Sequence, residues 1–576
     1  MFSLMRKYLK DYKWYAIFSP IFMILEVGTD IFVPYLMTRI VDVGIKNGDA
    51  DYVIKYGIIM ALVALFGMAC GIISSFLGAK GGYGIGYNVR IALYKKIQEL
   101  SFNQLDNISI SSLITRVTAD CATISRVSMM SLRMAIRSPV LLIAAMIAAF
   151  SIDVKLSLIF VLFIPVLAIG VGLIFSKVRK YFLELQERVD DLNSIVNEDL
   201  VSIRVIKSFV REDFEKDRFS KYNENLRTTA LKAMDLLINM VPLMFIVIYA
   251  AIISVLWFGG KYVTTGRLGP GAITALITYC TQIYSALIMT SQYLMSLARA
   301  NTSSKRVKEV LQAEPDLTSP EDGGVYEVKD GRVNFVDVDF RYPGNQDDTL
   351  SNINLDIESG QTIGVIGSTG SAKTTLVQLI PRLYDSTRGE VKVGGLDVRK
   401  YNLTALRDQV GYVLQDNTLF SGTIRSNMHW GDPEASDEKI IKALKNAQAW
   451  EFVKDLPGQL DAKVEQGGDN FSGGQQQRLT IARTLLKDPK VLILDDSTSA
   501  VDMATDRKLR ASFRKNLGDI TTIIVAQRID SIKDSDEIVV MKTGGIDQIG
   551  THDELVKTND VYRELYETQV KGGLAE

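Results

Sequence analysis

The sequence predicts a chain of two parts: an α-helical membrane domain with six spans and long cytosolic helical extensions, followed by an α/β domain built around a P-loop. Long apolar runs recur through residues 1–300, whereas residues 320–576 have the mixed composition of a soluble α/β domain. In this second half, an apolar β-branched run leads into a glycine-bearing loop, a lysine, a hydroxyl residue and a helix-like segment. That order is the pattern of a P-loop, which binds the phosphates of a nucleotide.

Composition limits the kinds of protein that this chain can be. It has 576 residues, of which 47% are hydrophobic and 23% charged, and its net charge is −1. A chain of this length holds several domains. A nucleic-acid partner calls for a basic face, so the charge balance argues against one.

The cysteines and the first residues exclude two further features. Cys70, Cys121 and Cys280 lie in the first half without metal-like spacing, so we interpret them as small buried apolar residues with no disulfide framework. Residues 1–13 are basic and amphipathic and lack the short apolar core and cleavage site of a secretory signal. They predict a helix at the cytoplasmic face of a membrane.

Six segments are long enough to cross a hydrocarbon core, which takes about 20 apolar residues. The first and third carry charges, and the other four contain charge-free runs of about that length. A soluble helical bundle is the alternative, and the length of these apolar runs argues against it. The segments lie near 14–41, 57–79, 131–151, 156–176, 236–260 and 268–298.

The number of spans fixes the expected topology. An even number puts both termini on one side, together with the charged, helix-periodic stretches 80–130 and 177–235. The basic N-terminus agrees with the positive-inside tendency, and a P-loop needs cytosolic nucleotide. The sequence therefore predicts a multi-pass protein of the cell membrane, with both termini and the nucleotide-binding domain in the cytoplasm.

Four ionisable residues fall inside the predicted membrane region. Glu26 and Asp30 lie four apart on the first span, and Arg133 and Arg137 lie four apart on the third, so each pair shares a helix face. By position, Glu26 and Arg133 lie at similar depth, as do Asp30 and Arg137. Charges at membrane depth usually face a water-filled cavity or one another. A cavity wall that touches substrate and a structural ion-pair ladder between two helices are both open interpretations.

A change of composition marks the boundary between the two parts. Residues 299–330 lose the apolar character and pass through Pro315, Pro320 and Gly323. We expect a transmembrane domain over 1–310, a linker over 311–330 and a nucleotide-binding domain over 331–576.

The P-loop itself comprises residues 367–374, with the sequence GSTGSAKT. Its glycines let backbone N–H groups turn inward as an anion cradle. Lys373 can reach the outer phosphates, and the Thr374 hydroxyl can take a Mg²⁺ coordination position. Ala372 stands where the usual P-loop has glycine, and its methyl group narrows the allowed backbone angles.

Further stretches with phosphate and metal chemistry surround the P-loop. A strand-like run from residue 333 ends at Tyr342, whose ring can stack on a purine base or simply pack in the strand. Residues 471–478 begin FSGGQ and place a hydroxyl and two glycines at a helix start. Residues 490–496, KVLILDD, form an apolar strand that ends in acid, which is the Mg²⁺-holding half of a P-loop ATPase. The run 499–502, SAVD, and an apolar strand over 521–525 follow.

Taken in order, these stretches resemble those of an ATP-binding cassette (ABC) exporter half-transporter, in which six spans are fused to one cassette. The resemblance covers essentially the whole chain. Its ordered set is Tyr342, the P-loop, Gln415, FSGGQ, LILDD, SAVD and the residue after the last strand. Segments 112–120 and 199–209 resemble the family's intracellular loops, whose short coupling helices dock on the cassettes.

The resemblance implies a site shared by two chains. In the family, two cassettes sandwich two ATP molecules, each between the P-loop of one chain and the SGGQ of the other. The implied cofactors are ATP and Mg²⁺, with the metal held by Thr374, Gln415 and Asp495. The residues implied to bind ATP are Tyr342, Gly367, Ser368, Thr369, Gly370, Ser371, Ala372, Lys373, Thr374, Thr375, Gln415, Ser472, Gly473, Gly474, Gln475 and Asp502.

The chain departs from the family pattern at two catalytic positions. Asp496 stands where the family has the Glu that positions the attacking water, and its side chain is one methylene shorter. Gln527 stands where the family has a His that contacts the γ-phosphate, and glutamine cannot carry a positive charge or relay a proton. The only two histidines of the chain, His429 and His552, do not follow this strand.

These departures, with Ala372, fall in the chain's own nucleotide site, whereas the SGGQ that it contributes to its partner is intact. The chain therefore resembles the degenerate-site subunit of a bacterial heterodimeric multidrug ABC exporter. A homodimer with two slow sites is the alternative.

The leading functional hypothesis is ATP-driven export of an amphipathic small molecule from the cytoplasm. The expected partners are a second half-transporter, the lipid bilayer and a hydrophobic substrate, with no nucleic acid. A membrane regulator whose cassette only senses ATP is the competing hypothesis, and the intact FSGGQ argues against it. Drug, lipid and peptide substrates all remain open.

Overall fold

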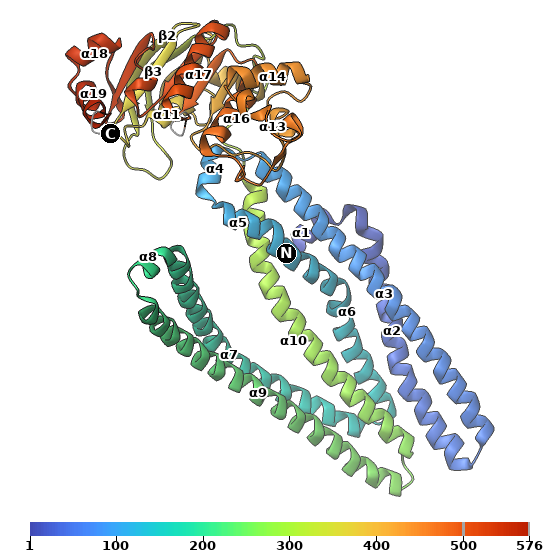
Figure 1. The fold of residues 1–576 in the computed structure, drawn as a ribbon. Helices are drawn as coiled ribbons and strands as arrows, with labels where there is room; N and C mark the ends of the chain where they lie inside the picture. The colour runs from blue at the N-terminus through green and yellow to red at the C-terminus, as the bar shows by residue number, and fades with distance from the viewer. Residues whose placement is uncertain (498–500, 574–576) are drawn as a thin grey trace. The chain divides into compact units, whose positions relative to one another are not determined.

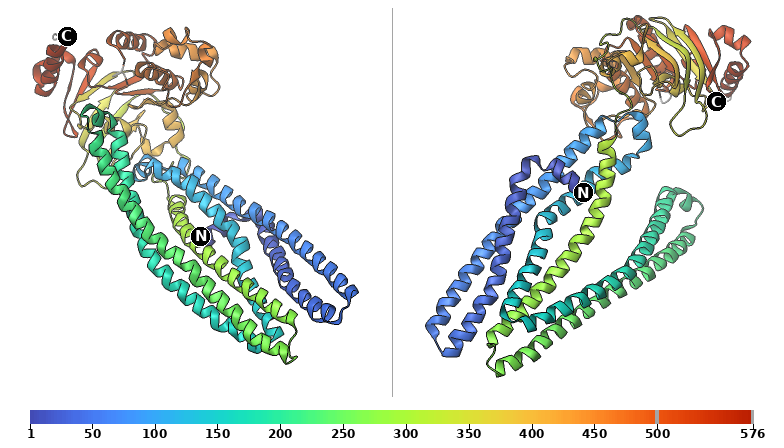
Figure 2. Two further views of the ribbon diagram at one scale, coloured as in Figure 1. Left: turned by 60° about the horizontal axis from the view of Figure 1, so that its bottom comes forward. Right: turned by 180° about the vertical axis from the view of Figure 1, so that it is seen from behind.

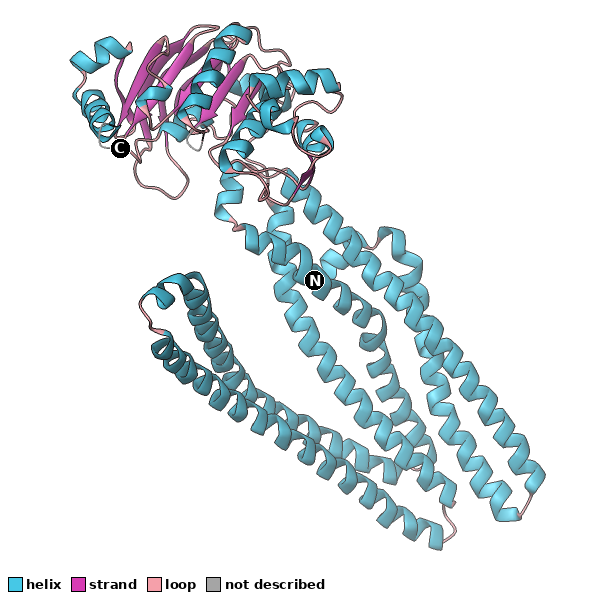
Figure 3. Cartoon of the chain, in the orientation of Figure 1, coloured by secondary structure: helices cyan, strands magenta, loops and turns pink. Residues whose placement is uncertain are grey.

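The computed structural model describes residues 1–497 and 501–573, so Ser499 and Ala500 of the SAVD run lie outside the described residues. The chain divides into two compact units, one of residues 1–98 and 111–312 and one of residues 99–110 and 313–576. The first unit is helical, and the described strands belong to the second (Figure 3).

The first unit is built from a few very long helices. Three of them, α3, α7 and α9, have 49, 48 and 53 residues, more than twice the roughly 20 that a membrane core requires. Such lengths confirm long helical extensions beyond the predicted spans. The helices are α1 (Phe2–Tyr8), η1 (Lys10–Tyr12), α2 (Lys13–Arg39), η2 (Ile40–Ile45), α3 (Ala50–Gln98), α5 (Ile110–Thr115), η3 (Arg116–Asp120), α6 (Cys121–Ile152), α7 (Val154–Val201), α8 (Ile203–Ser208), α9 (Glu212–Thr264) and α10 (Pro270–Gln312).

Five helical segments among the described residues are long and apolar enough to cross a membrane. They overlap five of the six predicted spans. The sixth, 156–176, lies within α7, where the described apolar stretch Val154–Val166 is too short to count alone. Six spans therefore stay a prediction at that one segment. The five are Lys10–Ile45, Ala50–Gln98, Ile110–Ile152, Pro242–Thr264 and Pro270–Gln312.

Small residues on α3 let it pack closely between α2 and α6. Gly82 and Gly86 are buried; a Cβ at Gly82 would lie 2.4 Å from the backbone nitrogen of Met129, and one at Gly86 would lie 1.7 Å from Ser125 Oγ. Close backbone approach through small residues is the usual way in which membrane helices associate. Elsewhere α7 and α9 run side by side over most of their length, joined through the short helix α8 (Figures 1 and 2).

The second unit contains two main sheets. The larger has the order β12-β11-β3-β10-β9-β6, in which all neighbours are parallel except β12. The smaller, β2-β1-β4-β5, is antiparallel, and β7 pairs with β8. The strands are β1 (Val333–Phe340), β2 (Leu350–Ile357), β3 (Thr362–Gly367), β4 (Arg388–Val393), β5 (Leu396–Asp397), β6 (Val410–Val413), β7 (Gly422–Thr423), β8 (Lys463–Val464), β9 (Val491–Asp495), β10 (Thr521–Val525), β11 (Glu537–Lys542) and β12 (Gly545–Gly550).

Two hydrophobic cores hold this unit together. One joins the parallel sheet to its helices α14, α16, α17, α18 and α19, and the other fills the space between the two sheets and α11. The helices are α4 (Phe102–Asn107), α11 (Lys373–Gln378), η4 (Val398–Lys400), α12 (Leu403–Gln409), α13 (Ile424–Met428), α14 (Asp437–Asn446), α15 (Trp450–Val453), η5 (Gln459–Asp461), α16 (Gly473–Leu485), α17 (Met503–Asn516), η6 (Ile529–Ser531), α18 (His552–Thr558) and α19 (Asp560–Gly573).

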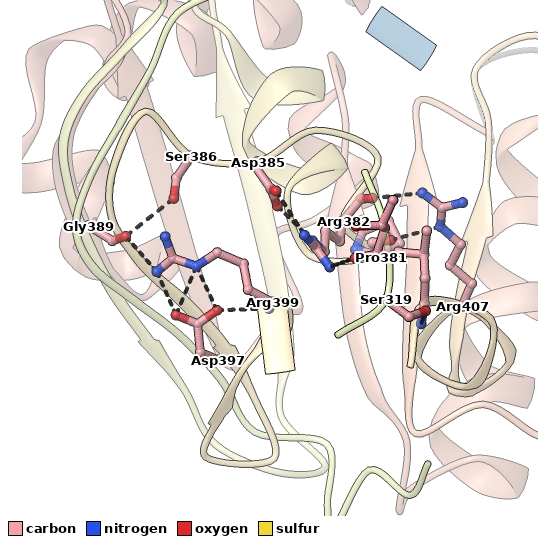
Figure 4. A network of polar contacts seen from close by, with 11 residues as sticks. Ser319, Pro381, Arg382, Asp385, Ser386, Gly389, Asp397, Arg399 and Arg407 are labelled. Carbon is pink, nitrogen blue, oxygen red and sulfur yellow. Dashed lines mark hydrogen bonds and ion pairs between the residues drawn. The ribbon is translucent and has the colours of Figure 1, made fainter. Parts of the chain in front are cut away.

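Part of the predicted linker is attached to this second unit by hydrogen bonds from Arg382 and from the Leu403 backbone (Figure 4 shows Arg382 and Ser319). Arg382 is only 6% exposed, pairs with Asp385 at 2.7 Å and donates a hydrogen bond to the Thr318 carbonyl at 3.0 Å. Ser319 Oγ accepts a hydrogen bond from the Leu403 backbone N–H at 3.0 Å. A buried guanidinium must be paired, so these bonds attach residues 318 and 319 to the ATPase-like unit.

Candidate nucleotide-binding site

The parallel sheet brings three predicted segments to one edge. Val525 of β10 pairs with Val365 of β3 on one side and with Asp495 of β9 on the other. The P-loop follows β3, Gln527 follows β10, and Asp496 follows β9. The carboxyl ends of parallel strands are where ligands bind in open α/β sheets, so this edge is the candidate site.

The P-loop closes around its own lysine. Lys373 Nζ donates hydrogen bonds to the carbonyls of Gly367 at 2.8 Å and Ser368 at 2.9 Å. Burial lowers the pKa of Lys373 from its usual range, and the nearby Asp496 and Asp495 carboxylates oppose that shift. The ammonium group therefore lies within the loop, where the phosphates of a nucleotide could meet it.

Ala372 adopts the backbone conformation that glycine would supply. Its φ is +68° and its ψ is +24°, in the left-handed region, at the residue that caps α11. A residue with a Cβ pays about 1–2 kcal/mol to adopt this conformation. The loop thus keeps the geometry that its usual glycine favours, with added backbone strain.

Thr374 and Asp495 meet as expected for a metal site. Thr374 Oγ1 donates to Asp495 Oδ1 at 3.0 Å, and the Tyr412 phenol donates to Asp495 Oδ2 at 2.7 Å. Burial raises the pKa of Asp495 above the usual carboxyl range, against the hydrogen bonds from Tyr412 and Thr374. Mg²⁺ prefers oxygen ligands and is typically held by one or two carboxylates with substrate phosphates, so the residues present fit this ion. Gln415, also predicted there, is exposed just beyond β6.

The two residues that depart from the family pattern contact each other. Gln527 Nε2 donates a hydrogen bond to Asp496 Oδ2 at 2.9 Å. Asp496 has a left-handed backbone, with φ of +47°. Burial and then the Asp495 charge raise the pKa of Asp496. The carboxylate at the position expected for the catalytic acid is therefore held by a neutral amide.

Tyr342 lies beside the P-loop helix rather than at the end of a strand. The strand ends at Phe340, so the prediction that Tyr342 ends it is wrong by two residues. Its phenol bonds to Thr375 Oγ1 at 3.1 Å and to Gln378 Oε1 at 3.3 Å, and its ring packs edge-on against Phe340 and Tyr384. Both interpretations of this residue survive, because the ring is packed yet partly exposed.

The predicted FSGGQ segment, the signature motif of residues 471–475, begins a helix on the surface. Ser472 caps α16, where its backbone N–H donates to Gln475 Oε1 at 2.9 Å and its hydroxyl accepts from the Gln475 N–H at 3.4 Å. Gly473 is exposed beside them. Among residues 1–497 and 501–573, no hydrogen bond joins this turn to the P-loop. Asp502 caps α17 through the N–H groups of Ala504 and Thr505.

The intramembrane charges form a cluster that matches one of the two pairs of similar depth. Arg137 bonds to Asp30 at 2.9 Å, as their depth allows, and also to Glu26. Arg133 takes part in no ion pair among the described residues, so a ladder rung between Arg133 and Glu26 is not formed there. Gly71 gives room for the Glu26 carboxylate, whose atoms lie within 3.2 Å of where a Cβ would stand.

Sequence reasoning missed Tyr412, which bonds to the metal-site carboxylate, and Gln378, which bonds to Tyr342. Tyr412 is three residues before Gln415 in an apolar strand, and nothing in that pattern distinguishes a packed ring from a phenol that donates to acid. Only the pairing of β6 with β9 brings it to Asp495. Residues 99–110, just upstream of the segment 112–120 that resembles an intracellular loop, group with the second unit.

Comparisons with known proteins agree over the whole chain. Residues 16–287 match the ABC transporter transmembrane region family, and residues 350–499 match the ABC transporter family. An uncharacterized ABC transporter ATP-binding protein of Bacillus subtilis, YfiB, is 35% identical over 98% of this chain and 97% of its own length. An ATP-dependent lipid A-core flippase of Desulfotalea psychrophila is 33% identical over 85% of each chain.

Two further similarities are informative. A Staphylococcus aureus protein provisionally described as a multidrug export ATP-binding/permease protein is 32% identical, over 98% of this chain and 99% of its own length. The solved structure of a bacterial Atm1-family ABC exporter with ATP bound superposes with a TM-score of 0.80, covering 96% of this chain and 98% of that one, at 22% identity. At that identity the similarity shows a common fold.

Proposed function

Because this chain belongs to the ABC transporter family and carries the transmembrane region and the ATPase domain in one polypeptide, we propose that it is one half of an exporter that moves amphipathic small molecules out of the cytoplasm. Relatives described as a lipid A-core flippase and as a multidrug exporter support a lipid-like or drug-like substrate. The basic N-terminal helix supports an orientation with the ATPase domain in the cytoplasm of a bacterial cell.

The contacts at the sheet edge support distinct roles for the residues of the P-loop. Lys373 neutralises the outer phosphates of ATP, and the backbone N–H groups of residues 367–372 cradle them. Thr374 and Asp495 hold the Mg²⁺ ion, with Gln415 joining them when it turns inward. Bound Mg²⁺ supplies neutralisation of charge on the phosphate oxygens. Tyr342 supports the base from beside α11.

The hydrogen bond from Gln527 to Asp496 carries the proposal that this chain's own site hydrolyses ATP slowly. A general base must have its carboxylate directed at the attacking water. Here one oxygen of a shortened side chain accepts from Gln527 instead, and no cationic imidazole is available at that position to contact the γ-phosphate. Displacement of a catalytic group by about 1 Å can cost on the order of 10²-fold in rate.

The exposed turn 472–475 completes a site on a second half-transporter. Ser472 and Gly473 are exposed at the start of α16, which has 13 residues, and the first N–H groups of a helix favour an anion. A subunit whose own site is slow can still supply an intact SGGQ to its partner. That SGGQ completes an active site formed by the partner's P-loop, catalytic acid and histidine. We therefore propose a heterodimer, in which most turnover occurs at the partner's P-loop.

The intramembrane cluster supports a structural role more than a direct role in substrate binding. Glu26 has a side chain only 15% exposed and Arg137 one of 22%, whereas Asp30 is 37% exposed. Arg137 links α6 to α2 through both carboxylates. Asp30 is thus the member of the set best able to touch a substrate with a donor group.

The test is the ATPase activity of the purified chain alone, beside the same chain co-expressed with the half-transporter of a neighbouring gene. Activity that appears only with the neighbour, and disappears when the neighbour's catalytic acid is neutralised, supports the heterodimer. Strong activity of this chain alone, abolished by Asp496→Asn, would establish a homodimer instead.

Transport distinguishes export from ATP sensing. Inside-out vesicles that contain the complex should accumulate an amphipathic fluorescent dye or lipid analogue only with ATP. ATP hydrolysis without any ATP-dependent accumulation across a panel of such probes would favour a regulatory subunit.

A further inference from the structure

Both oxygens of the Asp495 carboxylate are held by defined donors. Oδ1 accepts from the Thr374 hydroxyl at 3.0 Å and Oδ2 accepts from the Tyr412 phenol at 2.7 Å. Asp495 is 1% exposed, so bulk water does not compete for either oxygen. A carboxylate group whose two oxygens each accept a hydrogen bond cannot turn freely about the bond that joins it to the side chain.

The sheet fixes where the phenol lies. β6 and β9 are parallel neighbours, and Tyr412 stands opposite Ile493, two residues before Asp495. Its ring reaches along the strand direction from there to the carboxylate. Because both backbones belong to the central sheet, the distance between the phenol and the acid does not depend on a loop.

The P-loop helix ends beside the phenol. Gln378, the last residue of α11, is a polar neighbour of Tyr412. The same Gln378 accepts from Tyr342 through its Oε1 at 3.3 Å. The phenol that donates to the acid therefore lies beside a side chain that Tyr342 also contacts.

We propose that Tyr412 is a positioning residue for Mg²⁺ at this chain's nucleotide site, where its phenol keeps Asp495 Oδ1 directed at Thr374 and the metal. The proposal rests on the proposed function, because it needs Thr374 and Asp495 to hold the ion. Groups that orient a metal-binding side chain typically change metal affinity by about 10–100-fold when they are removed. Gln378 is a neighbour of both Tyr342 and Tyr412.

The experiment titrates Mg²⁺ against photolabelling of this chain by a photoreactive azido-ATP, in membranes that contain the assembled transporter. Separation of the chains on a gel assigns the label to this chain. Tyr412→Phe should raise the Mg²⁺ concentration for half-maximal labelling about 10-fold, with labelling in excess chelator unchanged. A midpoint equal to the wild-type value overturns the proposal.

Tyr401→Phe is the matched control. It also removes one buried phenol hydrogen bond of 2.7 Å in the same unit, but the acceptor is the Val393 carbonyl, away from the sheet edge. Its Mg²⁺ midpoint should equal that of the wild type. An equal rise in both variants would mean that loss of stability, and not positioning, changes the midpoint, which also overturns the proposal.

A double-mutant cycle covers the case in which Tyr412→Phe folds poorly. In an Asp495→Asn background, Tyr412→Phe should produce no further rise in the midpoint, because the oxygen that it orients no longer carries charge. A full additional rise contradicts the proposal. Absence of Mg²⁺-dependent labelling in the wild type would instead count against the proposed function.

Discussion

The Tyr384 phenol donates a 2.6 Å hydrogen bond to Asp106, a residue 278 positions earlier in the chain. Asp106 belongs to the short helix α4, which lies between two long helices of the membrane unit in sequence but groups with the ATPase unit in space. Phe102 packs on the same Tyr384 ring, and Gln104 Nε2 donates to the Glu314 carbonyl at 2.6 Å. These contacts therefore attach α4, which is followed in the chain by α5 and α6, to the ATPase unit.

Removal of this phenol should weaken coupling without harming hydrolysis. Hydrogen bonds to charged groups contribute about 1.5–3 kcal/mol, so we expect Tyr384→Phe to lower substrate transport per ATP by up to about 10-fold. Basal ATPase activity should stay within about twofold of the wild type, since the nucleotide contacts are untouched. Paired transport and phosphate-release assays measure the ratio, with Tyr401→Phe as control, and an unchanged ratio would contradict the expectation.

Restoration of the family's Glu at position 496 and His at position 527 should accelerate hydrolysis at this chain's own site. Asp496→Glu combined with Gln527→His supplies the missing methylene and an imidazole, and we expect a rise of about 10-fold or more. Phosphate release is measured in a complex whose partner acid is neutralised, so that only this site turns over. Each single variant is the control and should give a smaller gain. A double variant that is still photolabelled by azido-ATP but hydrolyses ATP no faster than the unsubstituted chain would contradict this expectation.

Local patterns sufficed for the elements that form this site. The β-branched run before the P-loop is β3, the acid-terminated run is β9, and the FSGGQ turn begins α16, each within one or two residues of the prediction. Even the strain at Ala372 follows from its place in the motif, since that place demands a left-handed backbone. Each of these features depends on a few residues that are adjacent in the chain, so a short stretch of sequence is enough to predict it.

Contacts between elements that are distant in the chain were harder to predict from the sequence. The order β3-β10-β9-β6 cannot be read from the order of strands in the chain, so the partner of Asp495 on β6 went unnoticed. The rotation of α6 about its axis depends on all its neighbours. Similar depth suggested Arg133 beside Glu26 and Arg137 beside Asp30, and only the second contact is formed among the described residues, because Arg137 bonds to both carboxylates.

The unequal roles of the two arginines in α6 can be measured. Arg137→Met leaves Glu26 and Asp30 without their ion pair, and loss of one partner from a buried pair costs about 3–5 kcal/mol. Arg133→Met, one turn away on the same helix, breaks no ion pair among the described residues and is the matched control. We expect a lower melting temperature in detergent for Arg137→Met alone. Equal losses in the two variants would show that the pairing does not stabilise the fold.

Relief of strain in the P-loop should stabilise the chain slightly. Ala372→Gly removes the left-handed cost of about 1–2 kcal/mol but adds about 0.4–1 kcal/mol of unfolded-chain entropy. The net gain is about 0.5 kcal/mol, seen as a small rise in melting temperature together with tighter binding of Mg²⁺-ATP. Thr543→Gly, at a left-handed residue in the turn between β11 and β12, should give a similar rise without a change in nucleotide binding. Weaker nucleotide binding by Ala372→Gly would contradict this account of the loop.

The cap at Asp502 predicts a pH-dependent contribution to stability. Hydrogen bonds from the Thr505 and Ala504 backbone N–H groups lower the pKa of Asp502 below its unfolded value. The unfolded chain therefore binds this proton more readily, so the contribution is present above the unfolded pKa of about 3.9 and is lost as pH falls through the folded pKa. Asp502→Ala should melt earlier than the wild type at neutral pH, and the difference should shrink below about pH 4. Asp502→Asn keeps the capping oxygen without the charge, so its melting difference from the wild type should be smaller than that of Asp502→Ala at neutral pH. It should also shrink below about pH 4, because both variants lack the titrating carboxylate. A difference for Asp502→Ala that is flat with pH would show that the charge of the cap contributes nothing.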